Sequence, residues 1–278
     1  MNLCGHQIFS VDVPPHGPEL ASPLLVLHGF PTSSFDFHAV VDVLAANRRV
    51  LLFDMLGYGL SEKPDIAYSF ALHADIAVAF VDALGVDRLG MLTHDVGDTL
   101  GGELLARQLE GGWEVEITDR AVTNGSIYMA LTQLSDGQRF LLALPDRRLP
   151  DDSSLDPGAV MAGVIATFGS GSTVDDQEIA AQREMIAHLD GHLLLPRLIR
   201  YVEERRRSEQ RFTEAIQRHP SPLVVVWGND DPIAVPAMAE RLCRIRGMGG
   251  PHLLEGVGHY PMIEAPDRFL GALAEAGG

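Results

Sequence analysis

Residues 88–107 read RLGMLTHDVGDTLGGELLAR, and this stretch decides the fold. The apolar residues 88–92 predict a buried strand, and residues 99–107 have a helix-like pattern. A sharp turn therefore lies between strand and helix, with Asp95 at its apex. A turn of this kind is a nucleophile elbow, which presents one side chain at the top of a sheet. Gly97 favours this interpretation over an ordinary helix-capping aspartate, because a strained turn needs small neighbours.

The residue type at the apex limits the chemistry. Most elbows carry serine, which works with a histidine base on acyl carbons. A carboxylate can instead displace a leaving group at a saturated carbon and form an alkyl ester. The sequence therefore predicts Asp95 as a covalent nucleophile.

Short apolar runs alternate with helical patterns on both sides of this turn. Strands are expected at 24–27, 49–53, 88–92, 119–123, 223–227 and 252–254, and helices at 72–84 with Ser69 as N-cap, near 235–246 and at 263–275. Such alternation implies a mostly parallel sheet with helices on both faces. The expected fold class is therefore α/β.

The alternation stops between about residues 127 and 217, where polar helical segments are broken by Pro and Gly. We interpret 127–217 as a helical lid inserted into a core of 1–126 and 218–278. A second independent domain is less favoured, because strands resume directly after the segment. Within it, the run Arg205–Arg207 is expected on a solvated helix face. Asp98, in the core, is expected either to cap its helix or to line the pocket.

Composition narrows the range of partners. The 278-residue chain is 46% hydrophobic and carries a formal net charge of −17. This charge disfavours nucleic acid and anionic membranes. No apolar stretch approaches the roughly 18 residues of a membrane-spanning helix. The first residues lack a basic region followed by an apolar run, so no signal peptide is expected.

The two cysteines, Cys4 and Cys243, lie far apart and match no metal spacing. Free thiols in a reducing compartment are the simplest interpretation, so a cytoplasmic location is expected. The chemistry calls for no metal and no organic cofactor. The expected partner is a small apolar or amphipathic organic substrate, and a homodimer is left open.

A covalent intermediate also needs donors for the oxyanion that forms during its hydrolysis. One donor is a backbone N–H from the loop after the first strong strand, and here that loop reads HGFP from 28 to 31. The Phe30 N–H is therefore predicted as one donor and the Val96 N–H as the other. His28 is expected to bind loop backbone and to take no part in the chemistry.

The second step needs a base and a group that orients it. His259, on a Gly-flanked loop after the last strand, suits a general base. Asp231 is predicted to hold its imidazole in the right tautomer, with Asp230 as the local rival. The order Asp95, Asp231, His259 is the nucleophile–acid–base order of α/β hydrolases.

Together these motifs resemble the aspartate-nucleophile branch of the α/β-hydrolase fold, which holds epoxide hydrolases and haloalkane dehalogenases. The motifs that carry the resemblance are HGFPTSS at 28–34, FDMLGYGLS at 53–61, THDVGD at 93–98, GNDDP at 228–232 and GHYP at 258–261. The runs 28–37 and 92–98 resemble most closely the mesoderm-specific-transcript group. By its place after the strand, Asp231 matches the catalytic acid of the family, and Asp230 does not.

The same resemblance bears on the leaving group. Haloalkane dehalogenases usually carry Trp directly after the nucleophile, and fluoroacetate-type dehalogenases carry Arg, whereas this chain has Val96. Epoxide hydrolases use lid tyrosines that hydrogen-bond the epoxide oxygen. Tyr201 resembles the placement of one of them, with a lid-packing aromatic as the alternative. A second lid tyrosine is not evident, since Tyr128 at the lid entrance fits poorly.

The leading prediction is therefore an epoxide hydrolase that forms a vicinal diol through an alkyl ester on Asp95, with Tyr201 activating the substrate. A haloalkane dehalogenase with an unusual halide site and an ester or lactone hydrolase are the alternatives, because fold does not fix function. The non-enzyme alternative is a ligand-binding pseudoenzyme. The intact set of Asp95, Asp231 and His259 argues against it, since binding alone does not require all three.

Overall fold

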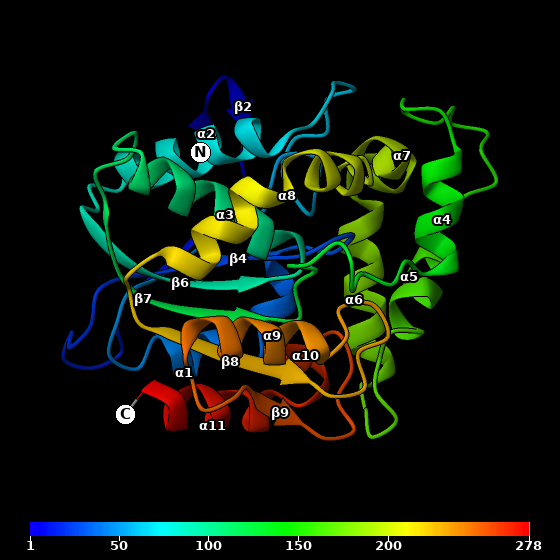
Figure 1. Cartoon of the computed structure of the whole chain (residues 1–278). Helices are drawn as coiled ribbons and strands as arrows, with labels where there is room; N and C mark the ends of the chain where they lie inside the picture. Colours follow the sequence, from blue (N-terminus) through cyan, green and yellow to red (C-terminus); the bar gives the residue numbers. More distant parts are fainter. Residues whose placement is uncertain (278) are drawn as a thin grey trace.

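The computed structural model describes residues 1–277 and is built around a seven-stranded sheet (Figure 1). In spatial order its strands are β3 (Ser10–Val13), β5 (Val50–Phe53), β4 (Leu24–Leu27), β6 (Arg88–His94), β7 (Glu116–Thr123), β8 (Leu223–Gly228) and β9 (His252–Leu254). Every neighbouring pair is parallel except β3 and β5, which are antiparallel. The mostly parallel sheet predicted from the sequence is confirmed. The edge strand β3 and the small N-terminal hairpin of β1 (Asn2–Leu3) and β2 (His6–Gln7) were not predicted.

Alternate residues of the central strands belong to different halves of the core. Leu25 and Leu27 of β4 pack into a cluster with α2 (Phe70–Ala83), α3 (Val96–Leu109) and α9 (Ala237–Arg246). Leu24 and Val26 pack into a second cluster with α1 (Val41–Leu44), α10 (Pro261–Glu264) and α11 (Pro266–Gly277). Because side chains alternate across a strand, helices cover both faces of the sheet, and the apolar run of β4 is buried throughout.

The predicted helices start and stop near their expected positions. Ser69 caps α2 by accepting the N–H of Leu72 at 3.1 Å, as predicted, although the helix begins two residues earlier than the periodicity indicated. The predicted C-terminal helix is divided into α10 and α11, because Pro266 starts a new helix.

The segment between β7 and β8 is helical. It contains α4 (Asp136–Ala143), α5 (Pro157–Ile165), α6 (Asp176–Ala187), the 3-10 helix η2 (His188–Leu194), α7 (Leu195–Leu198) and α8 (Tyr201–Arg218). In Figure 1, α4 to α7 lie beyond one end of the sheet, and α8 returns across it to pack against α3. The division into a core and a 127–217 lid stays a prediction, and these helices occupy the place expected for it.

The expectation of a solvated arginine run was wrong for Arg205. This side chain is only 3% exposed, whereas Arg206 and Arg207 are exposed. The physical reason is its helical spacing. Arg205 follows Tyr201 by four residues and therefore lies on the face of α8 that packs against the core.

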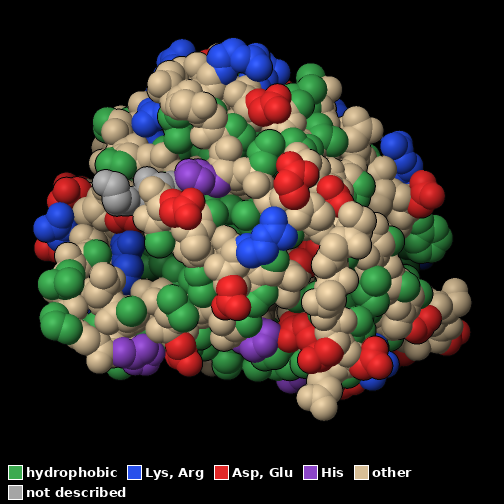
Figure 2. All heavy atoms as spheres, turned by 90° about the horizontal axis from the view of Figure 1, so that it is seen from below, with side chains coloured by type: hydrophobic (Ala, Val, Ile, Leu, Met, Phe, Trp, Pro, Cys, Tyr) green, Lys and Arg blue, Asp and Glu red, His purple; other side chains and the backbone are tan. Residues whose placement is uncertain are grey.

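One face of the molecule is mixed in charge. Figure 2 shows acidic and basic side chains interspersed with apolar ones on one face. Cys4 is exposed and Cys243 is buried, and both are free thiols. Within residues 1–277, none of the helices combines the length and the apolar character needed to span a bilayer.

Candidate active site

Asp95 stands at the apex of the turn between β6 and α3, with φ 49° and ψ −110°. A positive φ is strained for any residue other than glycine, so the surrounding packing must hold it. Gly97 makes this possible, because a Cβ there would lie 2.3 Å from the carbonyl oxygen of Leu27. A Cβ on Gly29 would lie 2.8 Å from the Cβ of Asp95. The elbow predicted from the sequence is therefore formed, and two glycines allow its close packing.

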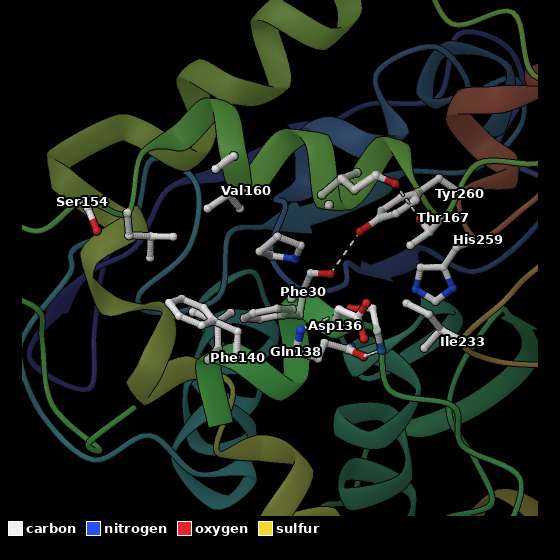
Figure 3. Close-up of a pocket in the computed structure, with 18 residues that line it drawn as sticks. Phe30, Asp136, Gln138, Phe140, Ser154, Val160, Thr167, Ile233, His259 and Tyr260 are labelled. Carbon is white, nitrogen blue, oxygen red and sulfur yellow. Dashed lines mark hydrogen bonds between the residues drawn. The ribbon is translucent and has the colours of Figure 1, made fainter. Parts of the chain in front are cut away.

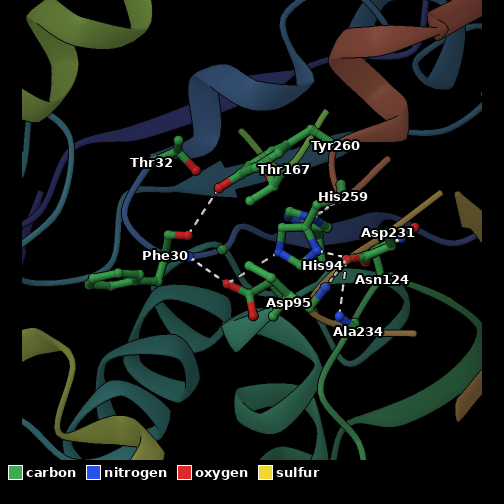
Figure 4. Close-up of polar contacts among 12 residues, drawn as sticks. Phe30, Thr32, His94, Asp95, Asn124, Thr167, Asp231, Ala234, His259 and Tyr260 are labelled. Carbon is green, nitrogen blue, oxygen red and sulfur yellow. Dashed lines mark hydrogen bonds and ion pairs between the residues drawn. The ribbon is translucent and has the colours of Figure 1, made fainter. Parts of the chain in front are cut away.

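The Asp95 carboxylate is buried and held on two sides (Figure 4). Its Oδ2 accepts the backbone N–H of Phe30 at 2.9 Å and lies 3.9 Å from Nε2 of His259. Val96, the other predicted oxyanion donor, is the first residue of α3. The structure thus brings the predicted nucleophile, one oxyanion donor and the base into one place.

The imidazole of His259 is anchored on its far side. Its Nδ1 lies 2.7 Å from Oδ2 of Asp231, and Oδ1 of Asp231 accepts the N–H groups of Ile233 and Ala234 at 2.8 and 3.0 Å. Asp230 instead accepts the N–H and hydroxyl of Ser170. The geometry therefore favours Asp231 over Asp230 as the group that orients His259.

Asn124 is a site residue that the sequence reasoning missed. It follows β7 with φ 49°, donates Nδ2 to Oδ2 of Asp231 at 2.7 Å and accepts the N–H of Gly228 at 3.0 Å. Its position at the carboxyl end of a parallel strand was an available signal, because such ends meet at one edge of the sheet. Asn124 gives the Asp231 carboxylate a fourth contact.

Glu264 was also missed. Its carboxylate accepts the N–H groups of Gly169 at 2.7 Å, Gly258 at 2.9 Å and Tyr260 at 2.9 Å. Gly258 and Tyr260 flank His259, and Gly169 follows α5. One buried carboxylate therefore fixes the loop of the base and ties it to the helical segment.

Charges in the site oppose the effect of burial. Burial would raise the pKa of Asp95, but the charge of His259 at 3.9 Å, with the charges of Arg205 and His94, outweighs it and holds that pKa below its usual range. Burial would lower the pKa of His259, but Asp231 and Asp95 outweigh it and hold that pKa above its usual range. The carboxylates on either side of His259 thus favour its imidazolium form.

A cavity of about 430 Å³ opens beside these groups (Figure 3). Apolar side chains from the core loops and from α4 and α5 dominate its wall: Phe30, Phe140, Leu141, Leu155, Val160, Val164 and Ile233. Figure 3 places His259 at one side and Phe140 and Ser154 at the other. The lining also includes Asp136 and His259 but no Lys or Arg. Because apolar side chains dominate the wall, the cavity suits a mainly apolar molecule.

Tyr201 lies behind the cavity wall. Its ring centroid is 5.5 Å from that of Phe30, and its hydroxyl accepts Nε2 of Gln138, a lining residue, at 3.3 Å. Because the amide is the donor in this bond, the phenol keeps its own proton for another acceptor. Tyr128 hydrogen-bonds Gln217 and lies outside the lining, so it remains a poor candidate for a second donor.

Two expectations about neighbouring side chains have clear outcomes. His28 accepts the N–H of Met55 on Nε2 and contacts the carbonyl of Gly29 through Nδ1, so it binds loop backbone as predicted. Asp98 neither caps α3 nor lines the cavity. It accepts the hydroxyl of Thr93 beneath the elbow, and burial raises its pKa well above the usual range.

A family model described as the alpha/beta hydrolase family matches residues 24–272. The chain belongs to the alpha/beta hydrolase family. A protein of Mycobacterium tuberculosis (strain ATCC 25618 / H37Rv) that carries the name LipZ is 34% identical over 92% of this chain and 88% of its own length. The mesoderm-specific transcript homolog protein of Bos taurus is 29% identical over 90% of this chain and 76% of its own length.

Solved structures show the same fold as this alpha/beta hydrolase. The haloalkane dehalogenase DbeA of Bradyrhizobium elkani has a TM-score of 0.78 at 22% identity, covering 99% of this chain and 95% of its own. The epoxide hydrolase CorEH has a TM-score of 0.75 at 18% identity, covering 99% and 96%. Together with the family match over residues 24–272, they confirm the predicted superfamily and fold class. The aspartate-nucleophile branch stays a prediction. At these identities the likeness concerns the fold and not the substrate.

Proposed function

We propose that this alpha/beta hydrolase opens epoxides to vicinal diols through an alkyl ester on Asp95. The observation that carries the proposal is the carboxylate at the elbow, which is held by the Phe30 N–H at 2.9 Å and faces His259 at 3.9 Å. A carboxylate in this position is suited to displacement at a saturated carbon. The apolar cavity beside it fits a mainly apolar substrate.

In the first half-reaction, Asp95 Oδ1 attacks an epoxide carbon, because Oδ2 is engaged by Phe30. A carbon–oxygen bond to Asp95 forms, the epoxide carbon–oxygen bond breaks, and the released oxygen takes the phenol proton of Tyr201. The imidazolium of His259 then returns a proton to Tyr201 through water. The products of this step are an alkyl ester, a neutral imidazole and a neutral phenol.

The second half-reaction uses the change in charge that the first produces. Esterification removes the negative charge of Asp95, one of the groups that raise the pKa of His259, so that pKa falls and the neutral base persists. His259 takes a proton from water, which attacks the ester carbonyl. The N–H groups of Phe30 and Val96 hold the oxyanion on Oδ2. The diol leaves and carries a proton, and the Asp95 carboxylate and imidazolium are restored.

The halide alternative has less support. Trp227 donates its indole N–H to the carbonyl of Ala234 at 2.6 Å, and neither Trp227 nor Trp113 lines the cavity. A halide leaving group would therefore lack an indole donor in the described lining. The phenol of Tyr201, one residue behind the wall, is the donor that favours an oxygen leaving group.

The test uses His259→Gln, which should form the ester and fail to hydrolyse it. The variant is incubated with styrene oxide, a 1,2-epoxyalkane, a 1-chloroalkane and an aryl ester, and intact mass is followed by peptide mapping. We expect an adduct of epoxide mass on Asp95, and none in His259→Gln that also carries Asp95→Asn. An adduct only from the chloroalkane, or turnover of the aryl ester by Asp95→Asn, would overturn the proposal.

Tyr201 is tested separately. Tyr201→Phe removes one hydroxyl and should slow ester formation by about ten- to a thousandfold. Tyr128→Phe is the matched control, because the Tyr128 hydroxyl bonds Gln217, which does not line the cavity, whereas the Tyr201 hydroxyl bonds the lining residue Gln138. Equal rates in both variants would remove Tyr201 from the mechanism.

A further inference from the structure

Arg205 is a buried cation beside the proposed nucleophile. Its side chain is 3% exposed. Its Nε donates to the hydroxyl of Thr99 at 2.7 Å, and Nη2 lies 3.5 Å from the backbone carbonyl oxygen of Asp95. The guanidinium carbon lies 5.1 Å from the centre of the Tyr201 ring. One side chain thus contacts the elbow and the proposed proton donor together.

None of these contacts is an ion pair. The two acceptors are a hydroxyl and a carbonyl, and within residues 1–277 no carboxylate forms a salt bridge with this guanidinium. Removing a cation from water without a bonded anion is unfavourable for folding, and an apolar side chain of the same size would avoid that cost. A buried charge without an ion-pair partner is a candidate for function, because active sites use such charges to shift the pKa values of neighbouring groups.

We propose that Arg205 is a positioning residue of this active site: its guanidinium holds the Asp95 turn and provides the positive charge that favours both the Asp95 carboxylate and proton donation by Tyr201. The part that concerns Tyr201 rests on the proposed function. A cation over a phenol ring stabilises negative charge on that ring, so it makes the hydroxyl a stronger donor. The part that concerns Asp95 holds for any reaction of that carboxylate.

The ionisable groups around Arg205 support this assignment. The charge of Arg205 favours the ionised form of four groups: Asp95 at the elbow, Asp98 on α3, Tyr201 on α8 and Tyr58 in the loop after β5. For Asp98 and the two phenols, burial outweighs it, and the groups stay neutral. Asp95 alone is also paired with His259. In the resting site, the charge of Arg205 therefore stabilises the Asp95 carboxylate. When the substrate oxygen gains charge, the same cation favours proton donation by Tyr201.

The test compares Arg205→Met, which removes the charge and keeps the length, with Arg205→Lys, which keeps the charge. Arg206→Met is the matched control, because Arg206 is the next residue in the sequence and its side chain is exposed. We expect Arg205→Met to fold, to lower kcat on an epoxide by about ten- to thirtyfold and to leave KM unchanged, because Arg205 does not line the cavity. Arg205→Lys should recover part of the loss, and Arg206→Met should match the parent.

A second measurement needs no turnover. Carbon-13 labelling of aspartate carboxyls, with Asp95 assigned by its loss in Asp95→Asn, follows the titration of that carboxyl by NMR. Its pKa should rise in Arg205→Met and stay in Arg206→Met. An unmoved titration overturns the proposal, whatever happens to kcat. So does a Lys variant as impaired as the Met variant, with kcat, KM and melting temperature all changed, because that pattern belongs to packing. If the parent opens no epoxide, the proposed function fails while the titration still decides the role of Arg205.

Discussion

Asn124 and His259 meet on the same atom, because Nδ2 of Asn124 and Nδ1 of His259 both lie 2.7 Å from Oδ2 of Asp231. The amide and the imidazole therefore share one carboxylate oxygen. This arrangement fixes where the carboxylate sits before the imidazole loses or gains a proton.

Asn124→Gly is expected to slow the second half-reaction selectively. Glycine keeps the positive φ of this position and removes the amide that steadies Asp231. The loss of one hydrogen bond to a charged group corresponds to about tenfold or more in rate. Rapid-quench measurement should show unchanged ester formation and slower ester hydrolysis. Equal slowing of both steps would contradict this role.

Asp98→Asn is expected to be nearly silent, and Asp98→Leu is not. Burial holds Asp98 neutral, so an amide can replace the acid and still accept the Thr93 hydroxyl. Leucine removes this acceptor and leaves the hydroxyl only the more distant carbonyl of Ala121 at 3.4 Å, which costs about 1–3 kcal/mol of unfolding free energy. Denaturant melts at pH 7 make the comparison. A large loss of stability in the Asn variant would show that Asp98 is ionised.

Glu264→Gln is expected to impair both stability and turnover. The side chain accepts three N–H groups, and glutamine offers one oxygen in place of two. We expect a loss of about 1–3 kcal/mol in unfolding free energy and a lower kcat, since the His259 loop loses its anchor. Glu240→Gln, at an exposed site on α9, is the control. Parent-like kcat in Glu264→Gln would limit the residue to the fold.

His73 should make the protein less stable in acid. Burial lowers the pKa of His73 to about 3, against an unfolded value near 6.5. A depressed histidine pKa means that the unfolded chain binds the proton first, so stability is full above pH 6.5 and falls as the pH drops toward 3. The slope is about 1.4 kcal/mol per pH unit for one proton. In His73→Leu, the unfolding free energy measured by urea melts should depend less steeply on pH between pH 6 and 4. If that pH dependence is unchanged, other groups cause it.

The sequence allowed prediction of the elements whose signal is local. Asp95, Asp231 and His259 each follow a strand, and parallel strands bring their carboxyl ends to one edge, so their meeting could be inferred. The packing of α8 could not be inferred in this way. The sequence has the same residue type at 205, 206 and 207. Only the packing of α8 against α3 determines that Arg205 is buried while Arg206 and Arg207 are exposed.

The supporting contacts were beyond reach for a similar reason. Glu264 contacts Gly169 across 95 positions, and Asn124 contacts Asp231 across 107. Neither residue belongs to a motif by its spacing. Their partners are set by how the helical segment folds back on the sheet, which depends on side-chain packing rather than on a repeated pattern.

The helical segment leaves and rejoins the sheet between neighbours, since β7 and β8 pair directly with Thr123 opposite Val226. The sequence of the helical segment, which supplies the α4 and α5 walls of the cavity, can therefore change in evolution while the reacting groups keep their places at the sheet. Bonds between the segment and the His259 loop limit that freedom. The backbone N–H of His259 donates to the carbonyl of Thr167 at 3.0 Å. Any segment that replaces this one must therefore still present a backbone acceptor to that N–H.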